Sequence, residues 1–487
     1  MNEGIVFDNN SNETPPGEAT PVTADPQTEP QSPIATPVTP PVDPGFAISN
    51  GGNSKKLLIK IIIGIVAIIL ITFIVFLLIP RGKSNEQVTL VWWGLWEDTR
   101  VMTPIIADFE RANPNIKVQY LKQNPEQYRN RLTTRITNGS GPDIFRYHNT
   151  WYPMLSDYLL PFSSDVISTA DFKKDFYPVM QTDLVHNGAI YGIPLEADTL
   201  SLFVNKDILD AAGEKAPTRW DDFCKVASKV TVKDASGKIQ TAGAALGLYG
   251  NVTHAQDIIS MLFAQQGITM QNILTSPDRT EAALEFYTAF AEGGKECPAE
   301  SMWNNTLDES RLAFGRGTLA MYFGYSWDIF DLQRMNKDLN YEIHPVPSLV
   351  NKNETIASYW VEGVSRQSQH QKEALLFMQY LAKKETAQKF YNEAAKVRSF
   401  GEPSARVDLA ASLKENKLIA SFVSQLPQAQ SSYFVSNTHD GEGGLNFLLN
   451  NYLGTAINQI EAGAAANSAV PSLNEGIGQV YTKYGIQ

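Results

Sequence analysis

The residues Leu57–Ile79 form a nearly unbroken apolar run in this chain of 487 residues. From Ile61 to Ile79 there is no charged side chain, and about 19 residues of α-helix cover the hydrocarbon core of a bilayer. A helix pairs its own backbone groups, so such a segment is stable in lipid without a partner. A buried core helix is the alternative, but basic residues flank the run at Lys55, Lys56, Lys60, Arg81 and Lys83. The run therefore predicts one membrane-spanning helix.

The segments on either side of the run are predicted to lack a fold of their own. Residues 1–54 contain no lysine or arginine and are rich in proline and threonine, which predicts a disordered tail with polyproline character. The tail is either a solvated spacer or a partner-binding segment. Residues 80–87 form a linker that lacks the small-residue pattern of a signal-peptide cleavage site. The count of basic residues gives a slight bias toward a tail inside the cell.

Composition and motifs exclude several classes of function. The net charge is -12 and there is no long basic run, which argues against nucleic-acid partners. The motifs H-E-x-x-H, G-x-S-x-G and the P-loop are missing, and the six histidines are scattered. We therefore expect no enzyme, no metal site and no cofactor. Cys224 and Cys297 lack the spacing of a metal site, and they are either one disulfide or two buried thiols.

Residues 88–487 begin with the pattern of an open α/β sheet. Three strands alternate with two helices, and the strands are predicted at Val88–Trp93, Ile116–Leu121 and Asp143–Phe145. The first helix is predicted to be capped by Thr103, with Pro104 in its first turn. The second helix is predicted at Tyr128–Thr137. Ligands of such sheets bind at the carboxyl ends of the strands.

The order of several motifs resembles a known family. The strings WWGLWE at 92–97, ITNGSGPDIF at 136–145, YGIPLEADTLSLFVNK at 191–206 and YEIHPVP at 341–347 follow one another as they do in bacterial extracellular solute-binding proteins. The segment that begins at Phe314 and contains GYSWD is similar to a part of the second lobe that brings aromatic residues to the cleft. The resemblance is to the maltose- and multiple-sugar-binding receptors of ABC importers, and it covers nearly all of residues 88–487.

The resemblance implies a two-lobe fold of the periplasmic-binding-protein type II. The first lobe is expected at 88–195 and 344–428, and the second at 197–343 and 429–487. Strands that cross between the lobes would form the hinge, and the last crossing is expected near Leu426–Tyr433. The implied chain is an α/β protein that follows a single transmembrane helix and a disordered tail.

Candidate ligand-binding residues follow from the chemistry of a sugar. Aromatic rings cover its apolar C–H faces, while carboxylates and amides bond its hydroxyls. The resemblance places a first-lobe aromatic at Tyr147 and a hydroxyl-binding carboxylate at Glu196. The full set of candidates is Trp96, Glu97, Tyr147, Asn149, Glu196, Asn251, Trp327, Trp360, Glu362, Gly363 and Tyr433.

The resemblance also implies a function. A monomeric, membrane-anchored extracellular protein would capture a carbohydrate, such as an oligosaccharide, between its lobes and deliver it to the permease subunits of an ABC importer. Its tail would lie in the cytoplasm. A tethered sensor or surface-interaction protein that uses the same cleft is an alternative, as is a binder of a non-sugar solute. Paired carboxylates leave a carbohydrate-active enzyme as a further alternative.

Overall fold

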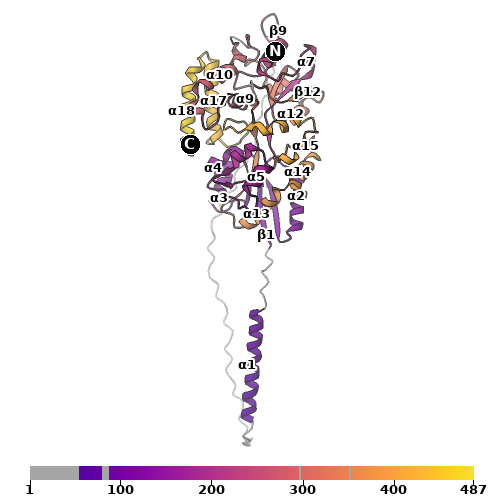
Figure 1. Ribbon diagram of the computed structural model, residues 1–487, viewed down its shortest axis with the longest axis vertical. Coiled ribbons are helices and arrows are strands. Elements are labelled where there is room, and N and C mark those ends of the chain that lie inside the picture. The colour runs from indigo at the N-terminus through magenta and orange to yellow at the C-terminus, as the bar shows by residue number, and fades with distance from the viewer. Residues whose placement is uncertain (1–53, 79–86, 295–297, 350–351, 487) are drawn as a thin grey trace, which may run out of the picture. The chain divides into compact units, whose positions relative to one another are not determined.

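The computed structural model describes residues 54–78, 87–294, 298–349 and 352–486. The chain divides into two compact units, 1–81 and 82–487. In the first unit, α1 (Ser54–Leu78) is one continuous helix (Figure 1). Its side chains are described at 59–70 and 72 only, and all of these are exposed. Within the described part of the chain, no helix has both the length and the apolarity to cross a membrane. The predicted tail at 1–54, apart from Ser54, and most of the predicted linker at 80–87 lie outside the described residues.

The first sheet of the second unit has the strand order β2-β1-β3-β14-β6. Its strands are β1 (Val88–Gly94), β2 (Ile116–Lys122), β3 (Ile144–His148), β6 (Ile193–Pro194) and β14 (Trp360–Val364). The strands β1, β2 and β3 are parallel, and β14 runs antiparallel to β3. Parallel neighbours need crossover connections, and α2 (Thr99–Ala112) and α3 (Tyr128–Thr137) supply them. The predicted alternation of strands and helices is confirmed here.

The start of α2 differs from the prediction. The helix begins at Thr99, and the side chain of Asp98 accepts a hydrogen bond from the backbone N–H of Arg100. Thr103 therefore lies inside the helix, where its hydroxyl donates to the carbonyl of Thr99 at 2.8 Å. The prediction of Thr103 as the cap is wrong, because an aspartate five residues earlier offers the same cap and the helix tolerates Pro104 inside it.

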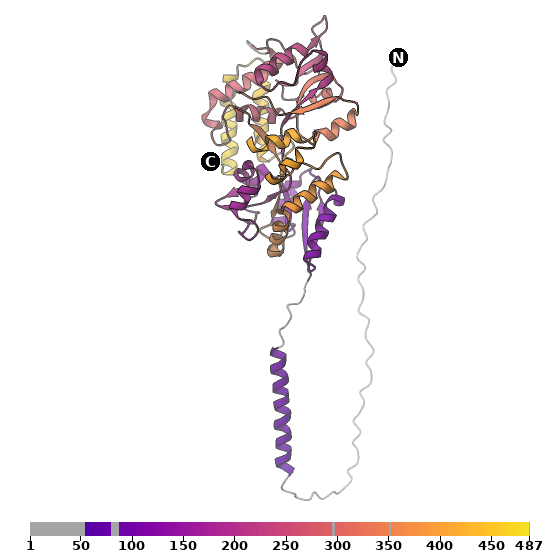
Figure 2. The same cartoon turned by 45° about the vertical axis from the view of Figure 1, so that its right-hand side comes forward.

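The second sheet has the strand order β12-β8-β11-β10-β9. Its strands are β8 (Ser201–Asn205), β9 (Val232–Lys233), β10 (Ile239–Ala244), β11 (Leu319–Gly324) and β12 (Tyr341–His344). The helices α9 (Ala255–Gln265), α10 (Pro277–Glu292), α17 (Leu445–Glu461) and α18 (Ala466–Tyr484) belong to the same hydrophobic core. Figure 2 shows α17 and α18, in yellow, packed side by side next to α10.

A small third sheet joins the two larger ones, and it contains β7 (Asp198–Thr199), β13 (Thr355–Ser358) and β15 (Ala429–Gln430). The chain passes from the first sheet through β7 to the second, and from the second sheet through β13 to β14 of the first. Two separate hydrophobic cores lie on either side of these strands. The architecture is thus a mixed α/β fold of two lobes, while the exact bounds given above for each lobe stay a prediction.

The structure does not decide whether Cys224 and Cys297 form one disulfide or are two buried thiols. Cys224 is buried in α8 (Trp220–Val230), and Cys297 lies outside the described residues. The possible disulfide therefore stays a prediction.

Candidate functional site

Among the residues that the structure describes, two cavities have walls from both lobes. The larger has a volume of about 620 Å³, a size typical of small-molecule sites. Segments far apart in the sequence form its wall. Its lining includes Trp96, Lys122, Glu196, Ala197, Asp198, Arg311, Trp327, Phe330, Asp331, Arg334, Ser358, Tyr359, Trp360, Glu402, Pro403, Asn437 and His439. Aromatic and charged side chains dominate this lining.

Three half-buried tryptophans line this cavity. Trp96 and Trp360 meet edge to face with their ring centroids 5.5 Å apart. Trp327, from the opposite lobe, stacks on Tyr325 at 4.3 Å with the rings 14° from parallel. The rings are fixed by aromatic neighbours on one side and reach the cavity on the other. Rigid aromatic surfaces of this kind suit a ligand with flat apolar faces.

The backbone is strained at several places in the same wall. Trp96, Asn437 and His439 have φ angles of 61°, 57° and 51°, in the left-handed region that L-residues rarely occupy. Such a conformation costs about 1–3 kcal/mol per residue and persists only where the surroundings hold it. The ring of His439 lies 5.2 Å from that of Trp96. Strain concentrated around one cavity is a common mark of a binding site.

Glu196 of the cavity lining belongs to a buried ion-pair network around Arg146 of β3. Its Nε donates to Oε1 of Glu362 at 2.5 Å, and its Nη1 donates to Oε1 of Glu196 at 3.1 Å. Trp92 Nε1 donates to the other oxygen of Glu362 at 2.7 Å. The side chains of Arg146 and Glu362 are at most 1% exposed. A charge in a fully buried strand requires such pairing.

A second guanidinium, that of Arg398, continues this network toward the cavity. Its Nη2 donates to Oε1 of Glu97 at 3.2 Å, and its Nη1 donates to Oε1 of Glu402 at 3.1 Å. One carboxylate oxygen from each of Glu97, Glu196 and Glu402 lies within 4.8 Å of the others. Burial, aided by the charge of Glu402, raises the pKa of Glu196 well above its ordinary value, and burial also raises the pKa of Glu97.

Asp198 of β7 adds a further buried carboxylate to this wall. Its Oδ2 accepts from the backbone N–H of Ser326 at 2.7 Å, and its Oδ1 accepts from that of Thr199 at 2.8 Å. Burial raises the pKa of Asp198 to about 7, although these hydrogen bonds oppose the shift. Ser326 directly precedes Trp327, so a crossover strand is bonded to the loop that carries a cavity tryptophan.

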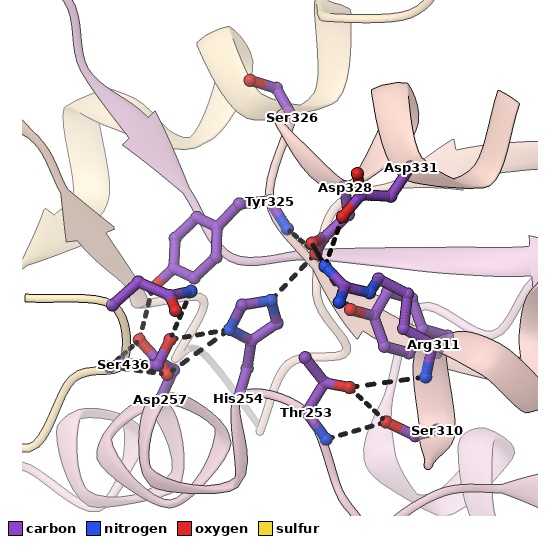
Figure 3. A network of polar contacts seen from close by, with 12 residues as sticks. Thr253, His254, Asp257, Ser310, Arg311, Tyr325, Ser326, Asp328, Asp331 and Ser436 are labelled. Carbon is purple, nitrogen blue, oxygen red and sulfur yellow. Dashed lines mark hydrogen bonds and ion pairs between the residues drawn. The ribbon is translucent and has the colours of Figure 1, made fainter. Parts of the chain in front are cut away.

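A second polar network centres on His254 (Figure 3), whose ring lies 6.3 Å from that of Trp327. His254 Nε2 lies 2.8 Å from Oδ2 of Asp328, and Nδ1 lies 2.7 Å from Oγ of Ser436. Asp257 accepts from the backbone N–H of Ser436 and from Tyr325 Oη at 2.8 Å. This network fixes the segment that leads to Asn437 and His439 against α9 and α12 (Asp328–Met335).

The pKa values in this network favour an ion pair. Burial disfavours the charged form of His254, but the nearby Asp328 carboxylate outweighs it and the pKa of His254 is raised. Burial likewise acts against the charged form of Asp328, yet His254 and further hydrogen bonds hold the pKa of Asp328 below its ordinary value. Ser436, His254 and Asp328 together resemble a hydrolase triad in composition, but only 9% of Ser436 is exposed.

A second cavity, of about 520 Å³, lies on other segments of both lobes. Asn149 and Tyr433 line it. Oδ2 of Asp183 accepts hydrogen bonds from Asn149 Nδ2 at 3.0 Å, from Tyr359 Oη at 2.6 Å and from Ser431 Oγ. Burial raises the pKa of Asp183 to about 6. Tyr359 also lines the larger cavity, so one residue contacts both.

The structure divides the predicted site residues into three groups. Trp96, Glu196, Trp327 and Trp360 line the larger cavity, whereas Asn149 and Tyr433 line the smaller one. The other five pack around the cavities: Glu97 and Glu362 hold guanidiniums, Tyr147 is buried in the first core, Gly363 packs closely on Tyr147 and Leu159, and Asn251 bonds Trp303 Nε1 and the carbonyls of Asn304 and Leu307.

Several residues of the site were not predicted. Arg398, Glu402, Asn437 and His439 come from segments where the sequence shows no local signal for a cleft. Arg146 does carry a signal, because a charged residue stands inside the apolar strand Ile144–His148. A charge at such a position points to a buried partner, although the sequence does not say which one.

A family model described as bacterial extracellular solute-binding protein matches residues 104–420, more than half of the chain. The chain belongs to this family. Among curated relatives of this solute-binding protein is the multiple sugar-binding protein of Streptococcus mutans, 22% identical over 68% of this chain and 80% of the relative. A putative ABC transporter periplasmic-binding protein of Escherichia coli, YcjN, is 24% identical over 50% of this chain and 57% of the relative. These relatives are binding proteins and not enzymes.

Solved structures share the fold of the solute-binding protein. One is a cyclo/maltodextrin-binding protein complexed with maltotetraose, with a TM-score of 0.65 and 19% identity over 82% of this chain and 98% of that chain. Another is the sugar-binding protein MalE from Xanthomonas citri, with a TM-score of 0.64 and 21% identity over 81% and 98%. The predicted resemblance and its two-lobe α/β fold are therefore confirmed.

Proposed function

We propose that this solute-binding protein captures an oligosaccharide in the larger cavity and delivers it to the permease subunits of an ABC importer. The observation that carries the proposal is the set of three tryptophans from two lobes, facing one cavity whose remaining wall is rich in carboxylates. Aromatic faces cover the C–H surfaces of a sugar, and charged acceptors bond its hydroxyls. The sugar-binding relatives and the maltotetraose-bound neighbour support the same ligand class.

The small sheet of β7, β13 and β15 between the two lobes suggests a mechanism for capture. The cavity has walls from both lobes, so only a closed arrangement contacts the ligand from both sides. Ligand binding then shifts the population toward that arrangement by the difference in affinity between the two states. The importer would recognise the closed form. In this proposal the protein acts as a monomer.

The proposed ligand is tested by binding measurements on residues 82–487. A panel of oligosaccharides is titrated by calorimetry, and thermal melting is followed in parallel because ligands of the folded state raise the melting temperature. Trp327→Ala is expected to weaken the binding sugar about 10- to 100-fold, since truncation of a buried aromatic anchor costs about 1–3 kcal/mol. Trp360→Ala is expected to act similarly.

The matched control for these variants is Trp93→Ala. Trp93 is also half-buried in the first lobe, but it lies outside the lining of both cavities. Its replacement should lower stability without changing affinity. If no sugar binds to the wild-type protein, or if Trp93→Ala weakens binding as much as Trp327→Ala does, the proposed ligand class or the proposed cavity is wrong.

We also propose that the protein is anchored by its own helix, with the tail in the cytoplasm and residues 88–487 outside the cell. This part rests on the amino-acid sequence of Leu57–Ile79, whose uncharged length suits a bilayer. Tethering would keep the receptor at high local concentration near its importer.

The anchor is tested by fractionation of cells that express the chain. The full chain is expected in the membrane pellet after alkaline carbonate washing, and it should require detergent for release. Residues 82–487, exported with a cleavable signal, should stay in solution. Release of the full chain by carbonate alone would contradict the anchor and leave the binding proposal intact.

A further inference from the structure

The acidic wall of the larger cavity holds more negative than positive charge. Four glutamates contact the two guanidiniums of Arg146 and Arg398: Glu97, Glu196, Glu362 and Glu402. Three of these four side chains are at most 6% exposed. Buried charges that lack an opposite charge are costly. The two guanidiniums leave two of the four carboxylates without an opposite charge, so this wall can accept further positive charge.

Glu196 identifies where that charge is missing. Only 4% of the residue is exposed. Its Oε1 accepts from Arg146, while its Oε2 receives no hydrogen bond from an N–H group in the part of the chain that the structure describes, and the carboxyl of Glu402 is its acidic neighbour. Both Glu196 and Glu402 line the cavity. A buried carboxylate oxygen normally accepts at least one hydrogen bond. A donor that arrives with the ligand would complete this site.

The opposite wall shows no such excess. Arg311 pairs with Asp328 and Asp331, and Arg334 also pairs with Asp331. His254, whose pKa is raised, lies between Asp257 and Asp328. Three basic groups thus face three carboxylates. The excess of carboxylates over basic groups therefore lies on the Glu196 side of the cavity.

We propose that the oligosaccharide bound here carries a protonated amino group, which sits against Glu196 and Glu402 with Glu97 behind them. This inference rests on the function proposed above. An ammonium has three N–H donors, and with N···O distances of about 2.8 Å its acceptors lie about 4.6 Å apart. The three carboxylate oxygens lie within 4.8 Å of one another. A glucosamine oligomer has the required chemistry, and the tryptophans would cover its sugar faces.

The test compares three tetrasaccharides with the same β-1,4 linkage, built from glucosamine, N-acetylglucosamine or glucose. Each is titrated calorimetrically into the full-length chain in detergent micelles at pH 6, with maltotetraose as a further neutral sugar and with EDTA present or absent. The glucosamine tetramer is expected to bind at least 10-fold more tightly than both β-1,4 neutral analogues. EDTA is expected to change nothing.

Two variants test whether Glu196 and Glu402 cause the preference for the amino sugar. In Glu196→Gln, the Kd of the neutral sugar divided by the Kd of the amino sugar should fall to about one. If this variant does not fold, Glu402→Gln, at a half-buried position, tests the same expectation. Asp331→Asn is the matched control: it removes a cavity carboxylate that two arginines already neutralise, so the ratio should persist.

The outcomes separate the two proposals. If neutral tetrasaccharides bind as tightly as the amino sugar, the amino-group proposal is overturned while the oligosaccharide proposal stands. Binding that EDTA abolishes would overturn it in favour of a divalent cation at the three glutamates. If no saccharide binds at all, the proposed function fails and this inference fails with it.

Discussion

Replacing Arg146 by methionine is expected to lower the free energy of unfolding of residues 82–487 by about 3–5 kcal/mol at pH 7, because removal of one partner from a buried ion pair leaves an uncompensated charge. Arg146 is 1% exposed and bonds both Glu362 and Glu196. Methionine fills a similar volume, so the loss is electrostatic rather than a cavity. Thermal and denaturant unfolding measure it.

The pH dependence of this loss has a defined sign. Burial already raises the pKa of Glu196 above its value in the unfolded chain, and loss of the Arg146 charge, which lowers this pKa, raises it further. Such groups destabilise the fold above their unfolded pKa, and the penalty disappears as the pH falls and they bind protons. The gap between wild type and variant should therefore shrink from pH 7 toward pH 4.

Two variants control for this prediction. The double variant Arg146→Met with Glu362→Gln should be less destabilised than the sum of its single changes, because the orphaned charge is removed as well. Arg100→Met breaks an exposed pair with Asp98, and it should leave the melting temperature almost unchanged. An Arg146→Met protein that melts like wild type at pH 7 would show that the buried network contributes nothing to stability.

The fold could largely be predicted because its signals are local. Strand and helix periodicities in the first 60 residues of the binding domain place β1, β2, β3 and the helices between them, and turn residues mark their ends. Asp98 shows the limit of such local rules, since two residues five positions apart, Asp98 and Thr103, can both cap a helix and the structure uses the first. Trp96 and Trp327, in loops that follow strands, and Trp360, the first residue of β14, are predicted ligand contacts, and the structure places all three around one cavity.

The charged part of the site could not be predicted, because its contacts are far apart in the sequence. Arg146 reaches Glu362 across 216 positions, and Arg398 reaches Glu97 across 301. The periodic patterns of strands and helices in the sequence do not indicate which distant residues form such pairs. As carboxylates near cleft loops, Glu362 and Glu97 are candidate sugar contacts in the sequence. In the structure, the carboxylates of Glu362 and Glu97 instead pair with the guanidiniums of Arg146 and Arg398. Glu196 and Glu402 line the cavity.

Each lobe has its own charge network beside the cavity. The Arg146 network is built on β3 and β14 of the first sheet, while the His254 network is built on α9 and α12 of the second lobe. Asp198 of β7 connects the lobes by its bond to the Ser326 N–H. Trp96 directly precedes Glu97 of the first network, and Trp327 directly precedes Asp328 of the second. Loss of either network should affect both stability and ligand affinity.

Asp328→Asn is the test of the second network, and we expect it to lower the free energy of unfolding by about 2–4 kcal/mol. Oδ2 of Asp328 accepts from His254 at 2.8 Å, from Tyr322 Oη at 2.9 Å and from the Tyr325 N–H at 3.1 Å, and Arg311 lies 3.4 Å from Oδ1. An amide of the same shape removes the charge that stabilises protonated His254. Because Trp327 directly precedes Asp328, ligand affinity should fall as well.

The gap between wild type and Asp328→Asn should be widest from about pH 4 to pH 6.5. The raised pKa of His254 gives stability that is present below its unfolded value, near 6.5, and is lost as the pH rises through the folded pKa. The lowered pKa of Asp328 gives stability that is present above its unfolded value, near 4, and is lost as the pH falls further. Melting temperatures across pH 3–9 measure this profile, with Asp338→Asn, at an exposed site just beyond α12, as the control. A gap that stays constant across this range would mean that His254 is neutral in the folded protein, and that Asp328 acts only as a hydrogen-bond acceptor.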